Sequence, residues 1–228
     1  MVKRHLKRIA TPSSWPIERK GTAWVTRPNP GAHTLDDGIS NNTIIKEILK
    51  FAKTTKEVKN ILQTKKVLIN GKQRKDTGFM VGVLDTIEFP EIGEAFRITL
   101  TSNKKLKTTK IDVKEVNLLP AKIVNKTKLK GGKIQLNLSS GKNMLVDKDN
   151  FKTQDTLIIE LPKQKIKETI EFKPNNLIYL IGGKHTGCTG KLLKIEGNTI
   201  EVEINKEKYN TLKRFAIAIG KDKPSITV

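Results

Sequence analysis

Residues 54–76 read TTKEVKNILQTKKVLINGKQRKD, and this stretch contains the start of a helix and a tight turn. Thr54 stands three residues before Glu57, which is the spacing of a capping box, so we expect a short helix to begin here. A strand at Lys66–Ile69 then meets Asn70-Gly71, the dipeptide that favours a hairpin turn. The stretch therefore predicts a helix followed by a β-hairpin.

The sequence on either side extends this pattern. Upstream, apolar residues recur at helical spacing and predict a first helix, at Ile44, Ile45, Ile48, Leu49 and Ala52. Downstream, apolar runs separated by turn residues predict a series of strands. These are Phe79–Val83, Thr86–Phe89, Ala95–Thr101, Thr109–Val113, Lys133–Leu138, Met144–Val146, Leu157–Leu161, Lys165–Phe172, Leu177–Ile181, Lys191–Ile195, Thr199–Ile204 and a last strand with Phe215, Ile217 and Ile219. The fold class is therefore α+β and mostly β.

Composition divides the chain into four expected regions. Residues 1–40 are basic, with four prolines and both tryptophans, and they contain too little apolar material for a core of their own. We expect an extended arm that orders on a partner; the alternative is a basic tail whose tryptophans pack against the next domain. The other regions are a helix–helix–hairpin domain at 41–93, a central β-rich domain at 94–173, and a final β module at 174–228 that follows the linker Pro174-Asn175-Asn176.

Charge is the strongest indication of a partner. The chain has 44 Lys and Arg against 23 Asp and Glu, which gives a net charge of +21. An excess of this size attracts polyanions, because each cation placed on a phosphate releases condensed counterions. The alternative is a solvated basic surface with no partner, although ordinary small domains have a net charge of about 2–8.

The remaining composition restricts the class of protein. The single cysteine, Cys188, forms no internal disulfide, which fits a reducing compartment. No apolar run approaches the roughly 18 residues that span a bilayer, and the basic N-terminus lacks the apolar segment of a signal peptide. We therefore expect a soluble intracellular protein that does not bind a membrane. We also expect it to be cytoplasmic and not an obligate homo-oligomer.

Enzyme chemistry has little support in this sequence. The histidines His5, His33 and His185 are far apart in the sequence, so we expect no metal site. Cys188 lies close to His185, but no third residue nearby would orient them as a nucleophile pair. Phosphate-binding glycine motifs of nucleotide enzymes are missing as well. We expect no catalytic residue, no cofactor and no small-molecule substrate.

Two stretches resemble known RNA-binding elements. The quoted stretch 54–76 is similar to the S-four RNA-binding domain, which presents two short helices and a hairpin as a basic surface. NLIYLIGGKHTGCTGKLLKI, residues 176–195, resembles a KOW motif, which implies an SH3-like barrel. We call residues 182–191 the glycine loop; its structural glycines are Gly183, Gly187 and Gly190, which we expect to adopt backbone angles that other residues avoid.

The order of these elements resembles one family over nearly the whole chain. That family is the archaeal and eukaryotic type of ribosomal small-subunit protein four, the S-four-e family. KRHLKRIATPSSWPIERK at 3–20, GVLDTIEFPEIGEAFRI at 82–98 and RFAIAIGKDKPSITV at 214–228 resemble its blocks. Eukaryotic members tend to continue further, so an end at Val228 indicates an archaeal member. The resemblance implies a structural role on the ribosome, with small-subunit ribosomal RNA and neighbouring ribosomal proteins as partners.

Two other functions were weighed against this one. A transcription elongation or termination factor also uses a KOW barrel, but no polymerase-binding domain is evident here. Some RNA-modifying enzymes combine an S-four domain with an aspartate in a Leu-Asp pair, which Leu84-Asp85 resembles faintly. The large catalytic domain of such enzymes is missing, so we interpret Asp85 as a turn or strand-edge residue.

The expected RNA contacts form three clusters of basic and aromatic residues. In the arm they are Lys3, Arg4, Lys7, Arg8, Arg19 and Lys20, with Trp15 and Trp24 stacking on unpaired bases. In the S-four region they are Lys46, Lys53, Lys56, Lys65, Lys66, Lys72, Arg74 and Lys75. In the glycine loop they are Lys184, His185 and Lys191. We expect these residues to recognise phosphates and RNA shape more than base sequence.

Overall fold

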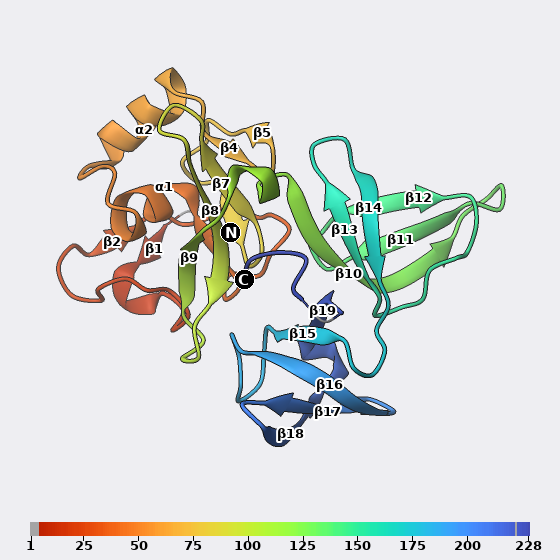
Figure 1. The fold of residues 1–228 in the computed structure, drawn as a ribbon. Helices are drawn as coiled ribbons and strands as arrows, with labels where there is room; N and C mark the ends of the chain where they lie inside the picture. The colour runs from red at the N-terminus through yellow and green to blue at the C-terminus, as the bar shows by residue number, and fades with distance from the viewer. Residues whose placement is uncertain (1–4, 222) are drawn as a thin grey trace. The chain divides into compact units, whose positions relative to one another are not determined.

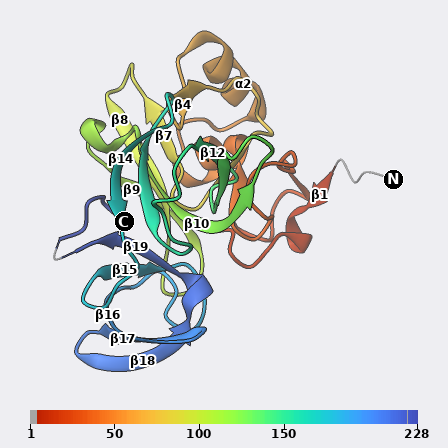
Figure 2. The same ribbon diagram turned by 90° about the vertical axis from the view of Figure 1, so that its right-hand side faces the viewer.

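The computed structural model describes residues 5–221 and 223–228, which form two compact units (Figures 1 and 2). The N-terminal unit comprises residues up to 100 together with 104–116, and the C-terminal unit comprises 101–103 together with 117–228. Each unit is built mainly from antiparallel strands. The expected fold class, α+β and mostly β, is therefore confirmed.

The N-terminal unit contains both α-helices of the described residues and three sheets. Its helical elements are η1 (Arg8–Ala10), α1 (Asn41–Thr43), η2 (Ile44–Ile48), α2 (Thr55–Thr64) and η3 (Val113–Glu115). Its strands are β1 (Leu6–Lys7), β2 (Trp24–Val25), β3 (Gly38–Ser40), β4 (Leu68–Ile69), β5 (Lys72–Gln73), β6 (Met80–Gly82), β7 (Thr86–Phe89), β8 (Glu94–Leu100) and β9 (Leu106–Lys110). β1 pairs with β2, β3 pairs with β6, and the largest sheet has the order β5-β4-β7-β8-β9.

The capping box and the hairpin turn both form as predicted. The Thr54 hydroxyl accepts a hydrogen bond from the Glu57 backbone N–H at 3.2 Å, and the Glu57 carboxylate accepts one from the Thr54 N–H. Asn70 and Gly71 have φ values of 51° and 72°, the left-handed angles that a tight hairpin turn requires. The first predicted helix forms as α1 followed by the π-helix η2, in which the Leu49 N–H donates to the Ile44 carbonyl five residues earlier.

The large sheet of this unit continues past residue 93, where the sequence suggested the end of a region. Strands β7 and β8 form an antiparallel hairpin in which Ile87 is paired with Phe96. The connecting turn ends at Gly93, whose φ is 71° and whose N–H donates to the Phe89 carbonyl. Because β8 also pairs with β9, the S-four-like hairpin and the two following strands share one sheet.

The C-terminal unit contains two five-stranded antiparallel sheets. The first has the order β12-β11-β10-β13-β14 and the second β18-β17-β16-β15-β19. The bounds are β10 (Leu118–Lys128), β11 (Ile134–Leu138), β12 (Asn143–Val146), β13 (Thr156–Glu160), β14 (Lys165–Ile170), β15 (Leu177–Leu180), β16 (Thr189–Glu196), β17 (Thr199–Ile204), β18 (Glu207–Leu212) and β19 (Ala216–Gly220), with η4 (Lys213–Phe215) before β19. In the second sheet the last strand returns beside the first, so the two ends of this module meet.

Two of these strands have no counterpart in the sequence prediction. β10 contains Pro120, a residue that argues against a central strand. Its first half pairs only with β13 and its second half only with β11, so Pro120 needs no N–H on its open side. β18 follows a turn at Asn205 and Lys206 with φ values of 52° and 71°, and this pair lacks the glycine that usually marks such a turn.

The first sheet of the C-terminal unit has a dense apolar core. Its buried side chains are Leu119, Ala121, Ile123, Ile134, Leu136, Leu138, Leu157, Ile159 and Leu161. The alternation Ile134-Gln135-Leu136-Asn137-Leu138 buries every second residue, as the sequence predicted. In β19, by contrast, all five residues from Ala216 to Gly220 are buried, so both faces of the last strand are covered.

Candidate nucleic-acid interface

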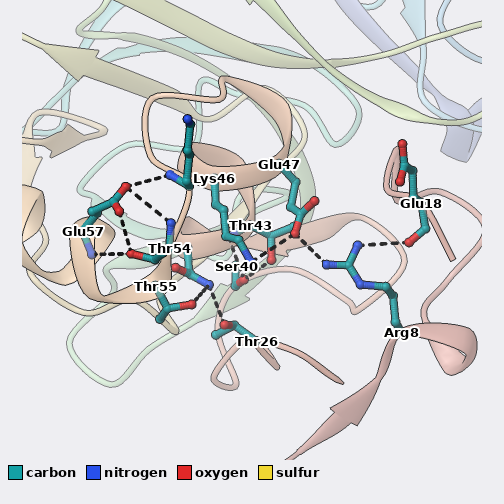
Figure 3. Close-up of polar contacts among 12 residues, drawn as sticks. Arg8, Glu18, Thr26, Ser40, Thr43, Lys46, Glu47, Thr54, Thr55 and Glu57 are labelled. Atoms are coloured by element: carbon teal, nitrogen blue, oxygen red, sulfur yellow. Dashed lines mark hydrogen bonds and ion pairs between the residues drawn. The ribbon is translucent and has the colours of Figure 1, made fainter. Parts of the chain in front are cut away.

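Arg8, predicted to contact RNA, instead takes part in the internal structure of the N-terminal unit. Its guanidinium donates to the Glu47 carboxylate at 2.6 Å and to the Glu18 carbonyl at 3.0 Å, and the residue is 5% exposed (Figure 3). Burial acts to raise the pKa of Glu47, but the contacts with Arg8 outweigh it and leave the pKa below its usual value. The RNA-contact prediction for Arg8 is therefore wrong, since the side chain is paired and buried.

The two tryptophans of the basic N-terminal segment lie in opposite environments. Trp15 is 3% exposed, and its indole N–H lies 3.1 Å from the carbonyls of both Leu35 and Gly38. It cannot stack on a base, so that prediction is wrong, and the alternative of tryptophan packing within the fold applies to it. Trp24 is 53% exposed, with His5 edge-on to its ring at a centroid distance of 5.2 Å and Lys7 nearby. Trp24 therefore presents an exposed aromatic ring beside the Lys7 cation.

The other basic residues predicted in this segment are exposed where the structure describes them. Lys7, Arg19 and Lys20 are exposed, and Arg19 donates to the Ile9 carbonyl at 3.1 Å. Lys3 and Arg4 lie outside the described residues. The segment from residue 5 to 40 is joined to the rest of its unit by backbone bonds, such as Asn29 N–H to the Gly78 carbonyl at 2.7 Å.

An exposed lysine surface covers α2 and the hairpin beside it. Val58 and Leu62 bury one side of α2, so the opposite side faces solvent. The exposed lysines of this region are Lys53, Lys56, Lys59, Lys66, Lys72 and Lys75, and we call them the α2–hairpin surface. Figures 1 and 2 both show α2 next to β4. Within the described residues, none of the six has an acidic ion-pair partner through its ammonium. Lys59 was not predicted, although it lies one turn from Lys56 and is found by helical spacing.

Three other residues predicted in this region have partners within the protein. Lys65 pairs with Glu91 at 2.6 Å, and Lys46 lies 3.5 Å from Glu47. Arg74 is only partly exposed, because its guanidinium lies over the Phe79 ring at 4.6 Å from the centroid. These side chains are less available to phosphates than the six of the α2–hairpin surface.

The glycine loop is shaped by backbone angles and close packing. Gly183 and Gly187 have φ values of 88° and 79°, as expected for positions that disfavour other residues. Gly190 does not have a positive φ, so that prediction is wrong for this residue. Glycine is needed here because there is no room for a side chain. An added Cβ would lie 2.7 Å from Val202 Cγ1 and from the Glu203 carbonyl oxygen.

The basic residues of the glycine loop remain at the surface. Lys184 and Lys191 are exposed, and neither forms an ion pair in the described part of the chain. His185 is half-buried and its ring stacks on Tyr209, with centroids 3.9 Å apart. Tyr209 was missed by sequence reasoning because it is supplied by β18, the strand that was not predicted. The glycine loop and the His185–Tyr209 ring pair together form a second candidate surface for RNA binding.

Another basic loop was not among the predicted RNA contacts. It connects β10 to β11 through Gly131 and Gly132, which have φ values of 88° and 80°. Lys128 and Lys130 are exposed there, and neither has an ion-pair partner among the described residues. The sequence signal was the pair of glycines among lysines in KTKLKGGK, residues 126–133.

Asp85 is a buried structural residue of the N-terminal unit. Its carboxylate accepts hydrogen bonds from Asn70 at 2.7 Å and the Gly82 N–H at 2.9 Å, and it lies 2.8 Å from His33 Nε2. Burial acts to raise the pKa of Asp85, but these contacts, first that with His33, outweigh it and lower the pKa. The side chain ties three segments together and has no access to a substrate. The strand-edge interpretation of Asp85 therefore fits its position after β6.

Other kinds of site are lacking in the part of the chain that the structure describes. No cluster of three or more histidine, cysteine or acidic side chains suited to a metal ion occurs among residues 5–221 and 223–228. Within the same residues, no helix is both long and apolar enough to cross a membrane. Cys188 is partly buried, and its N–H donates to the His185 carbonyl at 3.3 Å.

Comparison with known proteins places this architecture in a family. Residues 92–166 match the model of Ribosomal family S4e, and residues 2–36 match the model of the RS4NT (NUC023) domain. Small ribosomal subunit protein eS4 from Methanocella arvoryzae is 38% identical over 99% of this chain and 98% of its own. The same protein from Methanococcus maripaludis is 35% identical, with the same coverage of both chains.

A solved structure supports the same assignment. The crystal structure of the 30S ribosomal protein S4e from Thermoplasma acidophilum matches with a TM-score of 0.71 and 28% identity. The match covers 83% of this chain and 98% of that protein. Sequence models, full-length relatives and fold agree with one another. The chain therefore belongs to the eS4 family of small ribosomal subunit proteins.

Proposed function

We propose that this chain binds the ribosomal RNA of the small subunit as a structural, non-enzymatic component of the cytoplasmic ribosome. It contacts phosphates and recognises the shape of the RNA. The contacting residues are those of the α2–hairpin surface and the glycine loop, together with the exposed Lys7, Arg19, Lys20 and Trp24. Neighbouring ribosomal proteins are its other partners. It requires no cofactor, and it functions as a single copy.

The observation that carries this proposal is the absence of acidic ion-pair partners for the six lysine ammonium groups of the α2–hairpin surface, among residues that the structure describes. A capped helix and a tight hairpin hold their backbones, so charge is presented from rigid elements. Several exposed ammonium groups without acidic partners repel one another in the free protein and are favourable beside phosphates. Lysine supplies point charges rather than base readout, which suits recognition of backbone and shape.

The experiment is a salt titration of binding to small-subunit ribosomal RNA with the purified chain. We expect log affinity to fall linearly with log salt, with a slope of roughly −0.7 to −0.9 per phosphate neutralised and a total of several. A slope near zero would contradict backbone binding. Sedimentation of a cell lysate checks the location, since this account requires the protein in the small-subunit fraction and not with RNA polymerase.

A further inference from the structure

Lys122 is a buried lysine in the middle of β10. The residue is 4% exposed, and no carboxylate forms an ion pair with it in the described part of the chain. Its ammonium donates to the backbone carbonyls of Arg214 at 2.7 Å, Ala216 at 3.0 Å and Lys213 at 3.4 Å. All three acceptors belong to η4 and the start of β19. A side chain of the central sheet therefore binds the turn that precedes the last strand of the second sheet.

This arrangement accounts for a lysine that would otherwise be costly to bury. An ammonium group has three donors and no acceptor, and here three carbonyls receive them. Burial, and after it the charge of Lys213, lower the pKa of Lys122 to about 8. The group therefore retains its proton and all three donors at pH 7. The same contacts satisfy the Arg214 carbonyl, whereas the Lys213 carbonyl also accepts the Ala216 N–H that closes the helical turn.

The turn that Lys122 holds is also the support of the glycine loop. The Phe215 ring packs so closely against the loop that a Cβ at Gly182 would lie 2.4 Å from its Cδ1 atom. At Gly183 a Cβ would lie 3.6 Å from Cδ2 of the same ring. The Ile181 N–H donates to the Phe215 carbonyl at 2.9 Å, which fixes the start of the loop. Contacts thus run without a gap from Lys122 through η4 to the glycine loop.

We propose that Lys122 is a positioning residue for RNA binding, which holds η4 and Phe215 so that the glycine loop keeps its binding conformation. The RNA part of this statement rests on the proposed function of the loop. Lys122 itself contacts no phosphate, because it is buried. Its effect on affinity therefore passes through the loop, and the number of phosphates bound stays the same.

The test replaces Lys122 with methionine in the full-length protein, because methionine keeps an apolar stem and removes the donors. Lys126→Met is the matched control, since Lys126 lies in the same strand and pairs with Asp149 at the surface. Amide hydrogen exchange of residues 182–188 should increase roughly 2- to 30-fold in Lys122→Met relative to the parent. Exchange in β11 should stay unchanged, and Lys126→Met should resemble the parent. Equal exchange of the loop in parent and Lys122→Met would overturn the proposal.

RNA binding supplies a readout that a purely structural role would not give. Lys122→Met should weaken RNA binding by a similar factor, roughly 2- to 30-fold, with an unchanged salt slope. A lower slope would mean that Lys122 contacts phosphate in the complex, and the positioning role would be withdrawn. Lys184→Ala with Lys191→Ala tests the proposed function separately, because it should lower the slope and leave loop exchange as in the parent.

A second variant keeps the test valid if Lys122→Met is poorly folded. Phe215→Leu retains the carbonyls that Lys122 binds but removes the ring beneath Gly182. It should increase loop exchange with Lys122 intact. Combined with Lys122→Met it should add less than the sum of the two single effects, because both changes act on one chain of contacts. Fully additive effects would overturn the proposal.

Discussion

The N-terminal segment, residues 5–40, and the glycine loop, residues 182–191, both place basic residues beside aromatic rings. In the N-terminal segment much of this chemistry is used internally, since Arg8 binds Glu47 and Trp15 is buried. In the glycine loop Lys184 and Lys191 face solvent, and a lysine outside the loop, Lys122, supports it from behind. The two regions differ in the partners that lie within reach of their basic and aromatic residues. An acidic or apolar neighbour holds such a side chain inside the protein, whereas a side chain without one remains at the surface.

This contrast changes what is expected of the N-terminal segment. Its composition suggested an arm that orders only on a partner. Instead, Trp15 and His33 each make buried contacts, and backbone bonds such as Leu106 N–H to the Ser14 carbonyl at 2.8 Å connect it to the main sheet. The segment therefore has buried residues that stabilise the N-terminal unit and exposed ones that we propose contact RNA.

The sharpest way to break the comparison is to change each tryptophan in turn. Trp15→Ala should lower the free energy of unfolding of the N-terminal unit by about 3–5 kcal/mol, because it leaves a large cavity. Trp24→Ala should change it by less than about 0.5 kcal/mol, since the ring is largely exposed. Urea denaturation measures both. Of the two variants, provided that both fold, only Trp24→Ala should weaken RNA binding. The loss should be about 1–3 kcal/mol if a base stacks on this ring. Similar unfolding costs for the two changes would contradict the contrast.

The next largest effect concerns His33, which ties the N-terminal segment to Asp85. His33→Ala should destabilise the unit by about 3 kcal/mol, because a buried carboxylate loses its contact with the imidazole and keeps only two hydrogen bonds. His33→Gln, which can still donate a hydrogen bond, serves as the comparison and should cost less. The idea fails if His33→Ala unfolds at the same urea concentration as the parent at pH 7.

The same site predicts the direction of a pH dependence. The folded-state pKa of Asp85 lies below its unfolded value, so the carboxylate contributes stability that is fully present above about pH 4. That contribution is lost as pH falls through the folded pKa. Asp85→Asn should therefore be less stable than the parent at pH 7, and its stability should fall less on acidification. A parallel loss of stability in both proteins would exclude Asp85 as the titrating group.

In the glycine loop, folding and binding should separate. Gly187→Val should cost roughly 1–3 kcal/mol of stability, because a β-branched residue is strained at a φ of 79°. Lys184→Ala with Lys191→Ala should leave the melting temperature nearly unchanged and lower the RNA salt slope by up to about two. Thermal melts and salt titrations check the two results independently. RNA binding like that of the parent at several salt concentrations would remove the loop from the interface.

Local patterns in the sequence predicted much of the fold. The capping box at Thr54, the turn at Asn70-Gly71 and the alternation at residues 134–138 all depend on neighbours within a few positions, and each forms as expected. The strand β10 was missed because Pro120 is tolerated only by a pairing pattern that depends on residues far away in sequence. The turn at Asn205-Lys206 lacks the usual glycine, so β18 was missed too.

The candidate site was less predictable, because the local sequence around a basic residue does not indicate whether it pairs within the protein. Arg8 pairs with Glu47, which is 39 residues away, and no local signal distinguishes it from the exposed Arg19. The role of Lys122 was not predicted for the same reason, because its acceptors are backbone carbonyls more than 90 residues away in the sequence. Helical spacing, by contrast, places Lys59 on the same side of α2 as Lys56. Periodic positions can be read from sequence, whereas long-range polar contacts require the structure.

The central claim is that the lysines of the α2–hairpin surface neutralise phosphates of small-subunit ribosomal RNA. The most direct measurement is the salt slope of RNA binding for a variant with alanine at Lys56, Lys59, Lys72 and Lys75. A control variant with alanine at Lys110 and Lys194, which already pair with Glu94 and Glu196, accounts for loss of charge elsewhere. We expect the slope to fall in magnitude by about 0.7–0.9 for each lysine on a phosphate, while the control keeps nearly the parent slope. An unchanged slope in the four-lysine variant would contradict it.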